Sequence, residues 1–131
     1  MFILTLRTDN PEAEIGLYDG HKQLTCSAWR AHRELAETFH LKLDGILKEN
    51  DRGLQDIQGI VIYKGPGSFT GLRIGFSIAN ALADSLAVPV VSTTGKNDWV
   101  EQGINQLLSG KNDMIAQPIY GSAPKTTIAK K

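Results

Sequence analysis

A glycine-rich segment in the middle of the chain holds the residues best suited to chemistry. The glycines stand at positions 65, 67 and 71, and two cations, Lys64 and Arg73, flank them. Because this segment lies between a β-prone run and a helical pattern, its backbone N–H groups and the helix dipole can hold an anion. The spacing matches neither the phosphate-binding P-loop nor the dinucleotide fingerprint. Two interpretations stay open: glycines that permit close packing, and an anion site.

Nucleophilic and metal chemistry find less support in the sequence. Ser68 lies on the same turn, but all three histidines precede it, whereas a hydrolase with its serine on such a turn carries the histidine downstream. The single cysteine, Cys26, leaves no disulfide framework and no Cys-only zinc site within the chain. His32 and His40 are eight residues apart and lack ligand partners at helical spacing. We therefore expect no catalytic residue, no metal and no cofactor.

The elements that must position these residues follow from hydrophobic patterning. Strands are expected at residues 2–7, 13–18, 22–29, 57–63 and 88–92, and helices at 31–50, 69–87 and 97–109. Asp19-Gly20 is a hairpin signal, so the first three strands form an antiparallel meander. Right-handed crossovers then place the last strands parallel beside the first. The order βββαβαβα predicts an α/β fold with a mixed five-stranded sheet, as in one ribonuclease-H-like or actin-like (ASKHA) lobe.

The helix predicted at 69–87 is apolar on two sides. Its polar residues form one narrow stripe: Arg73, Ser77, Asn80 and Asp84. Small residues recur every four positions: Gly71, Gly75, Ala79 and Ala83. Ile74, Ile78 and Ala81 lie on another side, with Leu82 between the two. One apolar face can cover the sheet, so the other needs a second cover, from the helix at 31–50 or from another protein.

Composition excludes several classes of protein. The 131 residues are 41% hydrophobic and 21% charged, with 14 basic and 14 acidic side chains. This length fits one domain, and the zero net charge argues against a chain whose main task is to coat nucleic acid. Residues 111–131 carry four basic side chains and one acidic one, so a basic tail follows a mildly acidic body. No membrane span or signal peptide is evident, so a cytoplasmic location is expected.

The segment GPGSFTGLRIGFSIANALADSLAVPVVST, at residues 65–93, resembles the signature of the bacterial TsaB (YeaZ-like) family. Residues 3–8 and 30–47 are similar to the family's first strand and first helix, and residues 118–131 weakly resemble its C-terminal stretch. The resemblance implies a role in making threonylcarbamoyladenosine, a tRNA modification beside the anticodon. It also implies a non-catalytic scaffold that binds a TsaD-like catalytic subunit. A TsaE-type ATPase joins that complex, and tRNA is a partner only indirectly.

The same resemblance singles out two sets of residues. The family-signature loop comprises Gly65, Pro66, Gly67, Ser68, Phe69, Thr70, Gly71 and Arg73. The family's partner contact uses helices of the first lobe, so the expected interface residues are Phe39, Leu41, Ile74, Ile78 and Leu82. An apolar patch of this kind also allows a homodimer.

The sequence departs from the family pattern at two points. The family's first strand usually ends in Asp-Thr, whereas here Arg7 precedes Thr8, so independent ATP hydrolysis is not expected. Family members usually carry a second lobe. Residues 1–95 are interpreted as the N-terminal lobe, and residues 96–131 as a remnant helix and basic tail in place of the second. Two other functions stay open: an anion- or nucleotide-binding enzyme that uses Gly65–Gly71, and a self-associating remnant.

Overall fold

The predicted order βββαβαβα is confirmed in the computed structural model, which describes residues 1–31, 34–67, 69–95 and 97–117. The strands are β1 (Phe2–Arg7), β2 (Glu12–Asp19), β3 (Lys22–Arg30), β4 (Gly59–Tyr63) and β5 (Val90–Thr93). The helices are α1 (Leu35–Glu49), α2 (Phe69–Leu86) and α3 (Trp99–Leu108), with a short 3-10 turn, η2 (Leu54–Asp56), before β4. Within the described ranges, no helix combines the length and apolar character that crossing a membrane requires.

The strands form one mixed sheet in the order β3-β2-β1-β4-β5. β1, β2 and β3 pair as the predicted antiparallel meander, and Gly20 adopts a φ of +59° in the turn between β2 and β3. β4 lies between β1 and β5 and is parallel to both, as its continuous apolar sequence predicts. The carboxyl ends of β1, β4 and β5 therefore meet at one edge of the sheet, the usual ligand position in open α/β folds.

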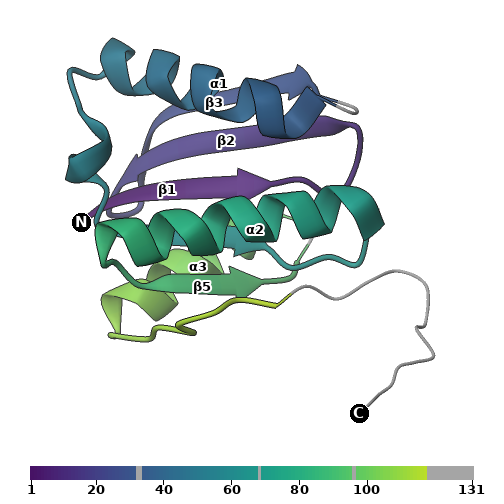
Figure 1. Cartoon of the computed structure of the whole chain (residues 1–131). Helices are drawn as coiled ribbons and strands as arrows, with labels where there is room; N and C mark the ends of the chain where they lie inside the picture. Colours follow the sequence, from purple (N-terminus) through teal and green to yellow (C-terminus); the bar gives the residue numbers. More distant parts are fainter. Residues whose placement is uncertain (32–33, 68, 96, 118–131) are drawn as a thin grey trace.

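Helices cover the sheet unequally on its two faces (Figure 1). Phe2, Leu4 and Leu6 point from β1 into the core under α1 and α2, while Ile3 points to the face under α3. α3 packs on β4 and β5, so residues 97–117 share the sheet's core with the preceding residues. α1 and α2 lie side by side on the same face, and the space between them becomes the candidate site (Figure 1).

Four predicted boundaries are wrong by two to four residues, and one of them is that of the third helix, which begins at Trp99 and not at residue 97. The helix expected from residue 31 begins at Leu35, because the Ala31 N–H bonds the Pro11 carbonyl and continues the β2–β3 pairing. The strand expected from residue 57 begins at Gly59, since Ile57 closes the η2 turn. The strand expected from residue 88 begins at Val90, because the Val88 N–H bonds the Ala83 carbonyl at the end of α2.

The segment Asn112–Ala116, which we call the C-terminal strap, runs along the free edge of β5. The Asp113 N–H donates to the Val90 carbonyl at 2.8 Å, and the Asp113 carboxylate accepts the Ser92 N–H at 3.1 Å. The Asn112 side chain accepts the Val90 N–H at 3.1 Å. These bonds satisfy edge groups that would otherwise be open to another strand, so the strap closes this side of the sheet.

Candidate functional site

The strand-end crevice, at the carboxyl ends of β1 and β4, is closed by an ion pair. Arg7 donates from Nε to Asp9 Oδ1 at 2.7 Å and from Nη2 to Asp9 Oδ2 at 3.1 Å. Its guanidinium also lies 4.1 Å from the centre of the Tyr63 ring. Hydrogen bonding to Asp9 raises the pKa of Arg7, so the cation is retained. Both charges of the crevice are thus neutralised within the chain.

The signature loop is packed against this ion pair. A Cβ atom at Gly67 would lie 2.8 Å from the Asp9 carbonyl oxygen and 3.1 Å from its Cα. A Cβ atom at Gly75 would overlap Thr8 Oγ1 and lie 2.9 Å from Thr8 Cβ. Such distances are shorter than real side chains tolerate, so only glycine allows the loop and α2 to approach the end of β1. These contacts favour the packing interpretation of the glycines over the anion site.

The residues of the crevice do not fit the phosphate or metal that actin-like folds hold at this edge. The Asp9 carboxylate is engaged by Arg7, so neither group is free to bind a metal or a phosphate without breaking the pair. The Thr8 hydroxyl is buried without a hydrogen-bond partner among the described residues, but it faces Gly75 on α2. The described ranges contain no group of three His, Cys, Asp or Glu side chains that could hold a metal.

The remaining signature residues lie on either side of the loop. Gly65 is buried with a φ of +99°, Pro66 is exposed, and Phe69 is the first residue of α2. Ser68 falls outside the described residues. Thr70 and Arg73 line a small hollow of about 380 Å³ on α2, together with Ile74 and Ile78. The signature therefore links the packed crevice to the apolar side of α2.

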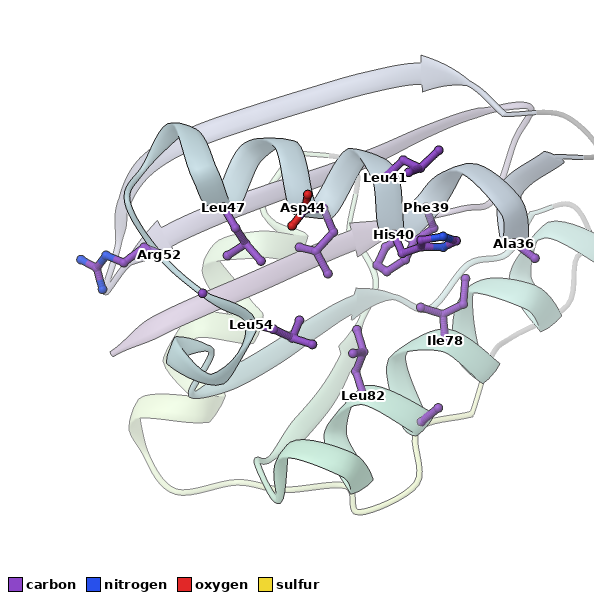
Figure 2. Close-up of a pocket in the computed structure, with 13 residues that line it drawn as sticks. Ala36, Phe39, His40, Leu41, Asp44, Leu47, Arg52, Leu54, Ile78 and Leu82 are labelled. Carbon is purple, nitrogen blue, oxygen red and sulfur yellow. The ribbon is translucent and has the colours of Figure 1, made fainter.

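A groove between α1 and α2 is the open part of this face. Its volume is about 600 Å³, and its lining is mostly apolar. Figure 2 shows Ile78 and Leu82 rising from α2 toward Phe39 of α1, with Leu54 pointing in from η2. His40, Asp44 and Arg52 are the charged or titratable groups along its rim. α1 therefore covers the second apolar side of α2 only in part, which leaves a groove that another protein can fill.

The five predicted interface residues lie on this one face of the molecule. Phe39 is only 4% exposed and forms the floor of the groove, so it can shape the surface but offers little contact area. Ile78 and Leu82 are half-buried in its wall, and Leu41, 66% exposed, stands on the outer rim. Ile74 lies in the adjoining small hollow, which shares Ala36 and Ile78 with the groove.

Other groove residues were not identified from the sequence. Leu54 is 40% exposed and enters the groove from η2, outside any amphipathic helix, so helical periodicity could not reveal it. In the sequence, Leu54 is marked only as an isolated leucine in the polar segment after α1. Leu47 falls on the buried side of α1 and also reaches the groove. Both residues enlarge the apolar surface that α1 and α2 provide.

Part of the chain resembles known proteins in sequence. Residues 28–94 match the family described as "TsaD: tRNA N6-adenosine threonylcarbamoyltransferase". Over 58 residues the chain is 49% identical to the tRNA threonylcarbamoyladenosine biosynthesis protein TsaB of Bacillus subtilis, a match that covers 44% of this chain and 25% of that protein. The part of that relative which the chain matches is thus about a quarter of its length.

Two solved structures share the fold of this chain. YeaZ from Pseudomonas aeruginosa superposes with a TM-score of 0.67 at 25% identity, over 78% of this chain and 50% of that chain. RuvC of T. thermophilus superposes with a TM-score of 0.51 over 72% of this chain and 64% of that chain. At 10% identity the RuvC likeness concerns the fold alone, and it confirms the ribonuclease-H-like arrangement predicted from the element order.

Proposed function

This chain belongs to the TsaD family of tRNA N6-adenosine threonylcarbamoyltransferases, and we propose that it acts in tRNA threonylcarbamoylation as a non-catalytic scaffold. In this proposal it binds a TsaD-like catalytic subunit and holds that subunit in its active arrangement. The similarity to TsaB supports the pathway. The single observation that carries the proposed role is the open apolar groove between α1 and α2.

The groove has the chemistry of a helix-binding surface. Amphipathic helices bind such grooves by inserting apolar side chains spaced at i, i+3 or i+4, and i+7. Ile78 and Leu82 are themselves one helical turn apart, so they form a continuous ridge for a partner helix to pack against. Burying one side chain of this size contributes about 1.5–3 kcal/mol. Several such contacts suffice for a stable heterodimer even after the entropic cost of association.

The closed strand-end crevice supports the non-catalytic part of the proposal. Substrate phosphates or a metal would have to displace the bonds between Arg7 and Asp9 before reaching the strand ends. Breaking a bidentate pair of this kind leaves an unpaired charge in a partly buried place, which is unfavourable. We therefore assign nucleotide and metal chemistry to the partner subunit. A TsaE-type ATPase belongs to the same proposed assembly in the cytoplasm, and tRNA is a partner only indirectly.

A pull-down with the TsaD-like subunit from the same organism tests the proposal. The wild-type chain is expected to retain the partner, and Ile78→Asp is expected to lose it, because the change replaces an apolar contact with a carboxylate that binding would remove from water. Leu41→Asp is the companion variant, since Leu41 is exposed and its replacement does not disturb the core. The absence of binding by the wild type, or full binding by both folded variants, would overturn the proposal.

Two rival functions have their own signatures. An anion- or nucleotide-binding enzyme would bind ATP, ADP or phosphate with micromolar affinity, and Arg73→Ala would abolish that binding in calorimetry. A self-associating remnant would form a homodimer through the groove in solution and ignore the TsaD-like subunit. Size measurement of the chain alone and mixed with that subunit separates this outcome from the proposed scaffold.

A further inference from the structure

A second hollow lies on the other side of α2 from the groove. Its volume is about 590 Å³, and it is bounded by α2, the start of β5 and the C-terminal strap. Its lining is again mostly apolar and consists of Asn80, Ala81, Ala83, Asp84, Ala87, Val88, Pro89, Asn112, Met114 and Ile115. Ala81 lines both the groove and this hollow. The two surfaces are therefore continuous across α2 at one small, exposed residue.

The rim of the second hollow carries the most exposed large apolar side chains in the described part of the chain. Met114 is 75% exposed and Ile115 is 69% exposed. Large apolar groups that gather at a surface hollow mark an interaction site more often than scattered ones do.

These two side chains are held in place by their neighbours in the strap. On one side, the Asp113 N–H bonds the Val90 carbonyl of β5. On the other side, the Ala116 N–H donates to Asn80 Oδ1 at 2.9 Å, and Asn80 Nδ2 donates to the Ala116 carbonyl at 3.1 Å. The Met114 N–H itself bonds the Asn112 side chain at 2.8 Å. A fixed backbone means that binding here orders little additional chain, which favours affinity.

We propose, on the basis of the proposed function, that the TsaD-like subunit straddles α2 and contacts the groove and the second hollow together. The partner then presents two apolar ridges, one on each side of α2. The outer surface of α2 allows such close approach, since Ser77, Ala81 and Ser85 are small and exposed at successive turns. Asp84 lines the second hollow, and its carboxylate has no hydrogen bond or ion pair within the described residues, so we expect the partner ridge that faces it to carry a basic side chain.

The test measures the dissociation constant of the chain for the TsaD-like subunit from the same organism. The variant that combines Met114→Asp and Ile115→Asp is expected to bind at least tenfold more weakly. Aspartate tolerates the positive φ of 66° at position 114, and the strap is held by bonds that these changes do not remove. Leu108→Asp is the matched control, because Leu108 is an exposed leucine on α3, on the opposite face, and its variant should bind within twofold of the wild type.

Reversing the charge at position 84 gives a second test of the same contact. Asp84→Lys is expected to weaken binding several-fold, with a larger effect at low salt, because it places a cation opposite the partner's basic group. If the strap variant and Asp84→Lys bind like the wild type while Ile78→Asp loses binding, the second contact is absent and the proposed function stands. Equal weakening by Leu108→Asp would also overturn the second contact. A wild-type chain that does not bind the subunit would overturn both proposals.

Discussion

The strand-end crevice and the α1–α2 groove lie on one molecule but differ in how many of their side chains remain exposed for binding. In the crevice, Arg7 and Asp9 bond each other, Gly67 of the loop packs on Asp9, and Gly75 of α2 packs on Thr8. In the groove, Ile78, Leu82 and Leu54 remain partly or largely exposed around a hollow of about 600 Å³. The strand ends, where this fold usually performs chemistry, are filled, and the apolar surface between α1 and α2 is open.

One helix joins the two regions and explains the contrast. Gly75 of α2 touches Thr8 at the end of β1, whereas Ile78, three residues later, faces the groove. Close packing of Gly75 on Thr8 thus sets how near α2 lies to the end of β1. Gly75 packed on Thr8 therefore helps to position the part of α2 that carries Ile78 into the groove wall. Three substitutions test the packing of α2, the ion pair of the crevice and the strap, beginning with the largest expected effect.

Gly75→Val should have the greatest effect on stability. Its side chain would occupy the space of the Thr8 side chain, which is buried and cannot move aside without displacing α2. Overpacking at such a position costs about 1–3 kcal/mol, and the β-branched residue adds to the strain. Urea unfolding should show a free energy of unfolding about 3 kcal/mol lower, together with loss of partner binding. A variant as stable as the wild type would show that α2 is not fixed by this contact.

Arg7→Ala should lower stability by a smaller amount. The change leaves the Asp9 carboxylate without its two charge-assisted bonds and removes the cation from the Tyr63 ring. The expected loss is about 2 kcal/mol in urea unfolding. Binding of the TsaD-like subunit should be unchanged, because the groove does not include Arg7. Loss of binding in a stable Arg7→Ala protein would contradict the separation of the two regions.

Asn80→Ala should have the smallest effect on stability and act on the strap. It removes both hydrogen bonds between the Asn80 side chain and the backbone of Ala116. We expect a loss of about 1–2 kcal/mol and faster proteolysis near Met114, since that end of the strap is released from α2. Unchanged proteolysis would mean that the bonds of Asp113 to β5 hold the strap alone.

The sequence predicted elements whose signal is local and missed contacts that join distant residues. The apolar run of β1, the Asp19-Gly20 turn and the two apolar sides of α2 are short-range patterns, and each corresponds to an element or surface of the structure. The polar stripe predicted on α2 is correct only in part, because the Asn80 side chain does not face solvent alone. It accepts a hydrogen bond from Ala116, 36 residues away. No periodicity encodes such a bond.

The sequence predicted only part of the closed crevice. Arg7 in place of the family's acidic residue predicted that the chain does not hydrolyse ATP independently. The bidentate pair with Asp9 could not be predicted, because it depends on how the chain turns after β1. The contact of Gly67 with Asp9 likewise joins two loops that only the parallel pairing of β1 and β4 brings together.

Site-specific photo-crosslinking locates the partner on this molecule most directly. A photo-reactive amino acid in place of Leu41, on the groove rim, is compared with the same amino acid in place of Leu108, on the opposite face. Both leucines are exposed on helices, so the two proteins differ only in the face that is labelled. We expect a covalent adduct with the TsaD-like subunit from position 41 and none from position 108. An adduct from position 108 alone would contradict the assignment of the α1–α2 face as the binding surface.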